Sequence, residues 1–241
     1  MIKQANIMND KCIIVTGSSS GIGRSITSKL LGLGAKVIGL ARDHNKFKIN
    51  NKNYVTYNID LNDFHSLAAV TKNILKENPH INVLVSNAGY GDFGPLENFS
   101  IDQIEKFISI NLTSHIVLTK CLLPHFKKIG GGDIIYMGSE AGLSGAKNGS
   151  LYCSAKFGLR GLSQSISKDV SNKNIRVCII NPGMVRTSFF KDLKFSPGDD
   201  PNNAIDVENI SSSVINILKL ERNTVIDEIN LSPLKKVLKF K

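Results

Sequence analysis

The sequence predicts a doubly wound α/β fold, an open parallel sheet of about seven strands with helices on both faces. Short runs rich in Ile and Val alternate with longer segments whose apolar residues recur at helical spacing. The short runs are continuously apolar, which is typical of parallel strands that are buried on both faces. No repeat, linker or sharp change in composition divides the 241 residues. We therefore expect one domain over residues 1–241.

The first half of the chain supplies four strands and two helices. Gly34 ends the first helix, because glycine tolerates the backbone conformation found at helix ends. The second helix carries Leu67, Val70 and Ile74 on one face, as helical spacing requires. The expected elements are strands at 11–16, 36–40, 54–58 and 82–86 and helices at 22–33 and 64–76.

The second half continues the alternation with longer helices. Right-handed crossovers between parallel strands place helices on both faces of the sheet, and ligands bind beyond the carboxyl ends of the strands. We therefore look for chemistry directly after each strand. The expected elements are strands at 133–137, 175–180 and 225–231 and helices at 101–126, 151–170 and 207–220.

Composition excludes several classes of protein. The formal charge is +10, but only six of the 30 basic residues are Arg, the usual residue for reading bases and phosphates. Most basic residues stand singly, and the one dense basic stretch is the tail at 235–241. We expect a solvated lysine surface and no nucleic-acid partner; an acidic protein partner or an anionic substrate is the alternative.

Membrane and secreted classes are disfavoured as well. No apolar run approaches the ~18 residues of a membrane span, and residues 1–10 contain no apolar segment typical of a secretory signal. The four cysteines are far apart and form no C-x-x-C pair. We therefore expect a cytoplasmic protein with free thiols, no membrane contact and no bound metal.

A glycine-rich turn joins the first strand to the first helix. It reads TGSSSGIG over residues 16–23, with the spacing G-x3-G-x-G. Glycines let the backbone turn tightly and approach a pyrophosphate closely, and the helix N-terminus offers free N–H groups and the positive end of its dipole. A tight turn without a ligand has a similar sequence, so this turn alone does not assign a function.

Further motifs follow the later strands. They are Asn87-Ala88-Gly89 after the fourth strand, Asn111 in the next helix, Ser139 after the fifth strand, Tyr152 and Lys156 four residues apart, and Asn181-Pro182-Gly183 after the sixth strand. Together with the glycine-rich turn they run from Thr16 to Thr187 in an order that resembles the short-chain dehydrogenase/reductase family. The resemblance implies a Rossmann-type fold and an NAD(P)-dependent oxidoreductase that acts on CH–OH groups.

The resemblance also assigns residues to roles. The expected catalytic residues are Asn111, Ser139, Tyr152 and Lys156, of which Lys156 binds the nicotinamide ribose and Asn111 anchors a water of a proton relay. The expected cofactor-binding residues are Thr16, Gly17, Ser19, Ser20, Gly21, Ile22, Gly23, Arg42, Asp60, Leu61, Asn87, Ala88, Gly89, Tyr152, Lys156, Pro182, Gly183, Val185 and Thr187.

The proposed catalytic pair also makes chemical sense without the family. Tyr152 and Lys156 lie at i and i+4 of a helix, hence on one face. A tyrosine ordinarily has a pKa near ~10, and a nearby ammonium should lower that pKa because it favours the phenolate. A phenol tuned in this way can give and take a proton. Ser139, at a strand end, can hydrogen-bond the same substrate oxygen.

The end of the second strand addresses the choice between NAD and NADP. An acidic residue there binds the ribose 2′-OH of NAD, whereas a nearby Arg suits the 2′-phosphate of NADP. Position 41 is Ala and Arg42 follows, so NADP(H) is favoured over NAD(H). Against NADP, Ser20 stands where the resemblance would place a basic residue, and Arg42 could instead pair with Asp43.

Two further positions also have more than one interpretation. Asp60-Leu61 resembles the pair that contacts adenine, but Asp60 could instead cap a helix. Segment 191–203 contains two prolines and a glycine and is expected to be a mobile lid over the substrate. The alternative is a fixed loop packed by Leu193 and Phe195. The residues expected to contact substrate are Ser139, Tyr152, Phe93, Leu143, Met184 and Phe189.

The predicted function is an NADP-dependent oxidoreductase that interconverts a carbonyl and a secondary alcohol of a small substrate. One alternative is a 3-oxoacyl-[acyl-carrier-protein] reductase, although the C-terminus lacks the Gly-Gly ending of the bacterial enzymes. Another is a non-catalytic dinucleotide sensor or scaffold, which would not need the Ser139, Tyr152 and Lys156 set. Helices 101–126 and 151–170 carry surplus apolar residues, including Leu159, Leu162 and Ile166, which favours a homodimer or homotetramer.

Overall fold

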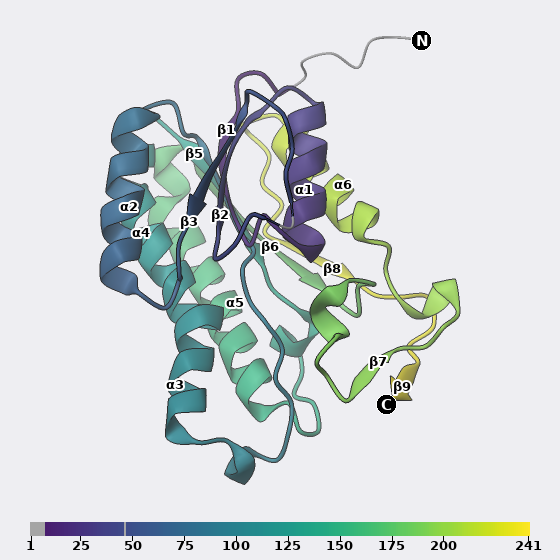
Figure 1. The fold of residues 1–241 in the computed structure, drawn as a ribbon. Coiled ribbons are helices and arrows are strands. Elements are labelled where there is room, and N and C mark those ends of the chain that lie inside the picture. Colours follow the sequence, from purple (N-terminus) through teal and green to yellow (C-terminus); the bar gives the residue numbers. More distant parts are fainter. Residues whose placement is uncertain (1–7, 46) are drawn as a thin grey trace, which may run out of the picture.

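The computed structural model describes residues 8–45 and 47–241, and its main feature is a seven-stranded parallel sheet (Figure 1). The strand order is β3-β2-β1-β4-β5-β6-β8, so the order reverses beside β1 and opens a crevice at the carboxyl ends of β1 and β4. The strands are β1 (Cys12–Thr16), β2 (Lys36–Ala41), β3 (Tyr54–Asn58), β4 (Val83–Ser86), β5 (Gly132–Met137), β6 (Ile175–Pro182) and β8 (Glu228–Leu231).

Helices cover both faces of this sheet. One core contains Ile26 of α1 and Val214 of α6, and the other contains Leu67 of α2, Leu118 of α4 and Leu159 of α5. Figure 1 shows α1 and α6 on one side of the sheet and α2, α4 and α5 on the other. The helices are α1 (Gly21–Gly32), α2 (Phe64–Glu77), α3 (Ile101–Ile108), α4 (Ser114–Lys128), α5 (Ser150–Val170) and α6 (Val207–Lys219).

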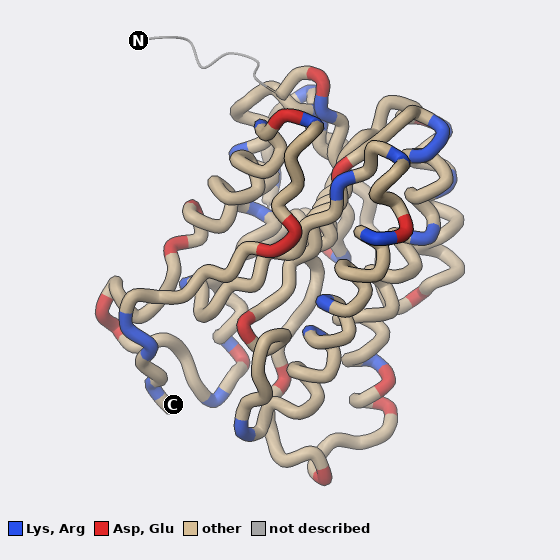
Figure 2. The backbone as a smooth tube through the Cα atoms, turned by 180° about the vertical axis from the view of Figure 1, so that it is seen from behind, with Lys and Arg blue, Asp and Glu red and all other residues tan. Residues whose placement is uncertain are grey.

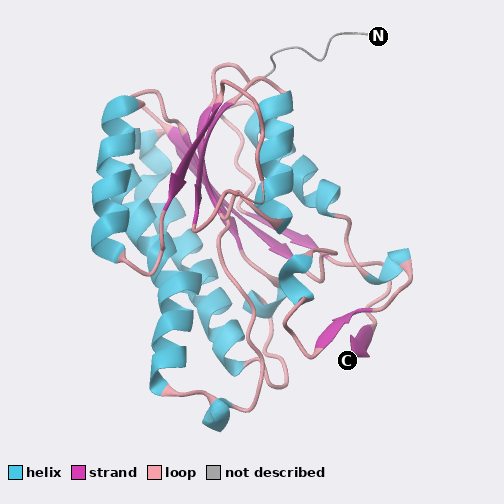
Figure 3. Ribbon diagram, in the orientation of Figure 1, coloured by secondary structure: helices cyan, strands magenta, loops and turns pink. Residues whose placement is uncertain are grey.

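Short turns link these elements, all but Ser171–Lys173 after the carboxyl end of a strand of the large sheet. Single 3-10 turns occur at Leu96–Asn98, Glu140–Gly142, Ser171–Lys173, Ser188–Phe190 and Pro201–Asn203. A separate two-stranded antiparallel sheet pairs β7 (Phe195–Pro197) with β9 (Leu238–Phe240), as Figure 3 shows beside the C-terminus. The sequence analysis did not predict either strand.

The predicted helix at 101–126 is divided into three parts. α3 ends at Ile108, a π-helical turn covers Ser109–Thr113, and α4 follows. By length and composition the continuous stretch Ile101–Lys128 could span a membrane, which the sequence analysis did not anticipate. In the structure, however, Leu122 and Phe126 of this stretch belong to the core beneath the sheet.

The last strand of the large sheet is shorter than predicted. β8 begins at Glu228 rather than at residue 225. The guanidinium of Arg176 donates to the carbonyl oxygens of Leu220, Glu221 and Thr224, which holds the approach to β8 in an irregular conformation.

The exposed apolar residues of the long helices are not those that the sequence predicted. Leu159 is fully buried in the core, and Leu162 and Ile166 pack against that core, so these three residues face the sheet. The large apolar side chains exposed on these helices are instead Ile101 on α3, Ile116 on α4 and Phe157 on α5.

Charged and sulfur-containing side chains follow the pattern expected from composition. Figure 2 shows Lys and Arg distributed over many elements. All four cysteines are free thiols, and Cys12, Cys153 and Cys178 are buried. Burial raises the pKa of Cys178 to about 12, so this thiol is an unreactive core residue.

Candidate active site

The glycine-rich turn between β1 and α1 needs its glycines. Gly17 and Gly21 have φ angles of +67° and +50°, in the left-handed region that glycine adopts without strain. A Cβ atom on Gly23 would lie 2.2 Å from the carbonyl oxygen of Gly17, so a larger residue would push α1 away from the turn. The N-terminus of α1, after Ser20, therefore comes close to the end of β1.

Thr16 and Asn87 join the ends of β1 and β4 beneath this turn. The hydroxyl of Thr16 accepts hydrogen bonds from the backbone N–H groups of Asn87 and Ala88, each at 2.9 Å. The Asn87 side chain donates to the carbonyl oxygen of Thr16 at 2.9 Å. The Thr16 side chain is thus engaged within the protein and joins the ends of β1 and β4. Cofactor binding by Thr16 stays a prediction.

The arrangement fits a dinucleotide pyrophosphate. The side chain of Thr187, which follows β6, lies 3.6 Å from the place a Cβ atom would occupy on Gly21. Ser19 is half-buried and Ser20 exposed at the N-terminus of α1, whose backbone N–H groups attract anions. Pro182 and Gly183 are on the same side as Thr187, while the side chain of Val185 belongs to the core.

A buried polar network supports the turn on the side of β2 and β3. The hydroxyl of Tyr54 donates to Ser18 Oγ at 3.3 Å, and Ser18 Oγ lies 3.0 Å from His44 Nε2. His44 Nδ1 lies 2.8 Å from Asn58 Oδ1. A Cβ atom on Gly39 would lie 2.5 Å from Ser18 Oγ, so glycine in β2 makes room for the network. Sequence reasoning missed it, because its members come from three separate segments.

The residues expected to select the cofactor lie next to this network. Arg42 is exposed directly after β2, and among the described residues it forms no ion pair; Asp43 instead accepts a hydrogen bond from the N–H of Asn45. Asp60 is exposed and caps a turn at Asn62, whereas the N-cap of α2 is Asp63. Leu61 is buried in the core, so only its backbone could contact a ligand.

The four predicted catalytic residues converge beyond the ends of β4 and β5. Lys156 Nζ donates to the carbonyl oxygen of Met137 at 3.0 Å, which places α5 against the turn that carries Ser139. A Cβ atom on Gly89 would lie 2.7 Å from Asn111 Oδ1 and 3.8 Å from Lys156 Nζ, so glycine leaves room between them.

Asn111 lies on the π-helical turn between α3 and α4. Its side chain accepts from the N–H of Tyr90 at 3.1 Å and donates to the carbonyl oxygen of Phe107 at 3.1 Å. Single π turns inside α-helices occur frequently at functional sites, because they interrupt the regular backbone hydrogen bonds. The sequence predicted the residue but not this distortion of the helix.

Burial is the main cause of the pKa shifts of Tyr152 and Lys156, both on α5. It raises the pKa of Tyr152 to about 12, and the hydrogen bond with Ser139 offsets only part of the rise. This corrects the expectation that the ammonium lowers the tyrosine pKa in the unliganded protein. Burial also lowers the pKa of Lys156 to about 8. Lys156 Nζ lies 5.7 Å from the centre of the Tyr152 ring and its hydrogen bond goes to the backbone.

Ser86 and His115 form a second contact that the sequence analysis did not identify. Ser86 Oγ lies 2.7 Å from His115 Nδ1, and both residues are buried below the Asn87-Ala88-Gly89 turn. Burial and the charge of Lys156 lower the pKa of His115 to about 3, so its imidazole is neutral. Ser86 therefore ties β4 to α4 beside the site.

Aromatic rings surround Tyr152 on the substrate side. Its ring centre lies 5.1 Å from Phe93, 6.0 Å from Phe189 and 6.2 Å from Phe107. Of the residues expected to contact substrate, Phe93 and Phe189 thus belong to one cluster with Tyr152. Leu143 is half-buried and Met184 is buried, and neither belongs to that cluster.

The segment at 191–203, here called the flap, closes this side. It contains β7 and the turn at Pro201–Asn203 rather than an irregular loop throughout. Phe195 packs on Phe93 with ring centres 5.1 Å apart, and Arg186 donates to the carbonyl oxygens of Gly198 and Asp200. Leu193 and Phe195 are both half-buried, and Phe195 contacts the rings of Phe93 and Phe190. Mobility of the flap remains a prediction.

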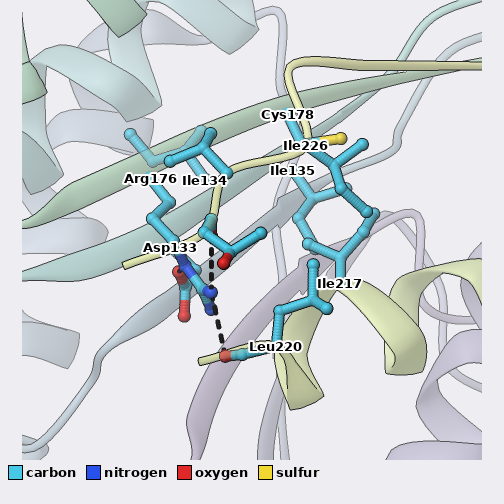
Figure 4. A pocket seen from close by; sticks show the side chains of 10 residues that line it. Asp133, Ile134, Ile135, Arg176, Cys178, Ile217, Leu220 and Ile226 are labelled. Atoms are coloured by element: carbon cyan, nitrogen blue, oxygen red, sulfur yellow. Dashed lines mark hydrogen bonds and ion pairs between the residues drawn. The ribbon is translucent and has the colours of Figure 1, made fainter. Parts of the chain in front are cut away.

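A separate pocket lies at the opposite ends of β5 and β6 (Figure 4). Asp133 accepts hydrogen bonds from Arg176 Nε and Arg222 Nη1, both at 2.7 Å. Arg176 and Asp133 are almost fully buried, and Arg176 also holds the loop before β8. This ion cluster fixes the amino ends of β5 and β6, opposite to the strand ends beside which Tyr152 lies.

Comparison with known proteins agrees with this geometry. The family model for short chain dehydrogenases matches residues 11–196. The 3-oxoacyl-[acyl-carrier-protein] reductase FabG of Salmonella typhimurium is 35% identical over 188 residues, which cover 76% of this chain and 77% of the relative.

Solved structures match over nearly the whole chain. A metagenomic short-chain oxidoreductase in complex with NADP is 28% identical with a TM-score of 0.81, covering 94% of this chain and 98% of that one. The closed form of serine dehydrogenase complexed with NADP+ is 26% identical with a TM-score of 0.82, covering 91% and 93%. The chain therefore belongs to the short-chain dehydrogenase family and is an NAD(P)-dependent oxidoreductase that acts on alcohol and carbonyl groups.

Proposed function

We propose that the protein is an NADP-dependent oxidoreductase that interconverts a carbonyl and a secondary alcohol of a small substrate. The observation that carries this proposal is the convergence of Tyr152, Lys156, Ser139 and Asn111 next to an aromatic cluster. A dinucleotide sensor would need the crevice at the glycine-rich turn but not this set.

The reaction divides between cofactor and protein. When bound, NADPH supplies the hydride that reduces the carbonyl carbon. Ser139 donates a hydrogen bond to the substrate oxygen and so stabilises the charge that develops on it. Tyr152 donates its phenolic proton to that oxygen, and in the direction of oxidation its phenolate takes the proton from the alcohol.

Lys156 and Asn111 support this proton transfer. The ammonium of Lys156 would hold the nicotinamide ribose by a hydrogen bond and, by its charge, would favour the phenolate of Tyr152. Burial raises the pKa of Tyr152 to about 12, and a nearby ammonium acts against that rise. Asn111, on the π-helical turn, would hold a water that passes protons between Lys156 and the solvent.

NADP is preferred over NAD in this proposal. Ala41 leaves no carboxylate to bind a ribose 2′-OH, and the exposed guanidinium of Arg42 is available for a 2′-phosphate. Solved relatives in complex with NADP support this preference. The binding crevice, the catalytic set and the aromatic cluster are assigned to one domain over residues 1–241, in a cytoplasmic homo-oligomer.

A second candidate is reduction of 3-oxoacyl groups on an acyl carrier protein. The similarity to the FabG reductase favours it, and exposed lysines could meet an acidic carrier. Against it, the flap covers the aromatic cluster where a long pantetheine arm would have to enter.

A screen of NADPH oxidation separates the two candidates. The panel contains small ketones, semialdehydes, quinones and acetoacetyl thioesters, each with NADPH and with NADH. Turnover of a small ketone or semialdehyde with NADPH supports the proposed function. Turnover of thioesters alone supports the carrier-protein candidate, and preference for NADH contradicts the assignment of the cofactor.

A further inference from the structure

The last seven residues, 235–241, here called the C-terminal strap, lie along the flap. β9 pairs antiparallel with β7 in the register Phe195–Phe240, Ser196–Lys239 and Pro197–Leu238. The N–H of Gly198 donates to Val237 at 3.0 Å, and the N–H of Lys241 donates to Lys194 at 2.9 Å. The strap therefore adds a second strand to an edge that the flap would otherwise expose.

Lysines of the strap add contacts on both sides of the flap. Lys239 pairs with Asp199 at 2.6 Å, and Lys241 Nζ donates to the carbonyl oxygen of Phe190 at 2.6 Å. Lys236 pairs with Glu140, the residue after Ser139, at 2.6 Å. Exposed ion pairs contribute little individually, so the backbone ladder is the main attachment and the lysines fix its position.

The strap is linked to the catalytic tyrosine through aromatic rings. Phe195 of β7 packs against Phe93 at 5.1 Å and against Phe190 at 5.9 Å between ring centres. Phe93 in turn packs against Tyr152 at 5.1 Å. Release of the strap would therefore free the ring that walls the site opposite Tyr152.

The strap belongs to the less general part of the chain. The family model matches residues 11–196, so it ends within β7 and does not include residues 235–241. The catalytic set, the cofactor crevice and Phe195 of the flap are inside the matched part, whereas the strap that pairs with the flap is outside it. A position outside the matched part fits an element that sets substrate specificity rather than the chemistry.

We propose that the C-terminal strap is a specificity-determining element that holds the flap closed and limits the site to small carbonyl compounds. Bulky substrates are disfavoured because Phe195 must leave Phe93 before they can reach Tyr152. The inference rests on the proposed function of Tyr152, but the attachment of the strap can be measured without turnover.

The hydrogen-bond pattern between β7 and β9 allows a matched pair of proline variants. The N–H of Gly198 donates to the carbonyl of Val237, and the N–H of Lys241 donates to the carbonyl of Lys194. The alternation of an antiparallel pair then makes Ser196–Lys239 a hydrogen-bonded pair and Pro197–Leu238 a non-hydrogen-bonded pair. The N–H of Lys239 thus points at the flap and that of Leu238 points away. Lys239→Pro removes a ladder donor, whereas Leu238→Pro introduces the same ring without that loss.

Hydrogen exchange of the full-length protein with NADPH bound tests the attachment. We expect backbone amides of the flap to exchange about tenfold faster in Lys239→Pro and within about twofold of wild type in Leu238→Pro. Lys239→Ala, which loses only an exposed ion pair, should resemble wild type. Equal exchange of the flap in the two proline variants would overturn the proposal.

A fluorescence reporter and two substrates test the effect on the site. The chain has no Trp, so Phe195→Trp supplies a single reporter, whose quenching by acrylamide should rise when Lys239→Pro is added. With diacetyl as the small probe and 1-phenyl-1,2-propanedione as the bulky probe, the bulky-to-small ratio of kcat/KM should rise about fivefold in Lys239→Pro, mainly through KM.

The combined results distinguish the proposed role of the strap from the proposed function of the protein. Unchanged NADPH affinity with a raised ratio supports the strap as a specificity element. Faster exchange with an unchanged ratio of kcat/KM would reduce the strap to a structural attachment and overturn the inference. Failure of the wild-type protein to bind NADPH would count against the proposed function, while flap exchange still decides whether the strap holds the flap.

Discussion

The ammonium of Lys156 donates a hydrogen bond to the backbone carbonyl of Met137 at 3.0 Å, two residues before Ser139. This bond joins α5 to the end of β5 and so sets the position of Tyr152, one turn earlier on α5, relative to Ser139. The lysine is almost fully buried. It therefore contributes to the geometry of the site before any ligand is bound, at a cost in stability.

That cost gives a pH-dependent prediction. Burial lowers the pKa of Lys156 from 10.5 to about 8, so between these pH values the unfolded chain binds a proton that the folded protein does not. Stability contributed by this residue therefore rises with pH from about 8 to 10.5. Lys156→Met should remove this dependence and raise the free energy of unfolding at pH 7 by about 2 kcal/mol, after loss of the hydrogen bond.

Urea titrations at pH 7 and pH 10 measure this difference. Lys120→Met, on the exposed face of α4, is the matched control and should change the free energy of unfolding by less than about 0.5 kcal/mol. If Lys156→Met is less stable than wild type at pH 7, burial of the ammonium is not costly and the lowered pKa is wrong.

Arg42 decides the preference for NADP in this account. Arg42→Ala should weaken NADPH binding by about 1.5–3 kcal/mol, the range for a charge-assisted hydrogen bond. Binding of NADH, which lacks the 2′-phosphate, should change little. Arg42→Lys keeps the charge and should recover part of the loss. Fluorescence titration measures both cofactors, and equal losses for NADPH and NADH would make Arg42 a structural residue.

The buried ion cluster at the amino ends of β5 and β6 should control stability but not chemistry. Asp133→Ala leaves Arg176 without its carboxylate in a buried position, so the free energy of unfolding should fall by about 3–5 kcal/mol. Glu208→Ala removes the more exposed pair with Lys29 and should cost at most about 1 kcal/mol. NADPH affinity of folded Asp133→Ala should match wild type; a large loss would place this cluster in the binding site.

Oligomerisation is expected to use α4 and α5. Ile116 and Phe157 are 41% and 44% exposed on these helices, more than the core residues around them. A pair of such faces could bury a standard interface of roughly 1,600 Å². Light scattering at micromolar concentration should give a dimer or tetramer, and Phe157→Glu should shift it toward monomer. A monomeric wild-type protein would reject the prediction.

The alternation of strands and helices and the order of the motifs could be predicted from the sequence, because buried parallel strands and glycine turns have local signatures. The sequence predicted Asn111, Tyr152 and Lys156 as residues, but not the π-helical turn at Asn111, which depends on the packing of α3 and α4. Nor could it place Thr16 beneath the turn rather than toward the ligand, because that depends on Asn87 in another strand.

Contacts between distant segments were the least predictable. The network of His44, Tyr54 and Ser18 joins three segments, and none has a recognisable pattern alone. The pairing of residues 195–197 with residues 238–240 has the same character. Both strands are three residues long, too short for a clear alternation of apolar and polar residues. From the sequence alone, we therefore interpreted the basic tail as solvated surface.

The most direct test of the central claim is the rate of carbonyl reduction by Tyr152→Phe in a single turnover with NADPH. We expect the rate to fall by on the order of 10²–10⁴ while NADPH affinity stays near wild type. Tyr136→Phe, a buried tyrosine whose hydroxyl lies 2.6 Å from that of Thr119, is the control and should keep the rate. A near-normal rate for Tyr152→Phe would contradict its role as the proton donor.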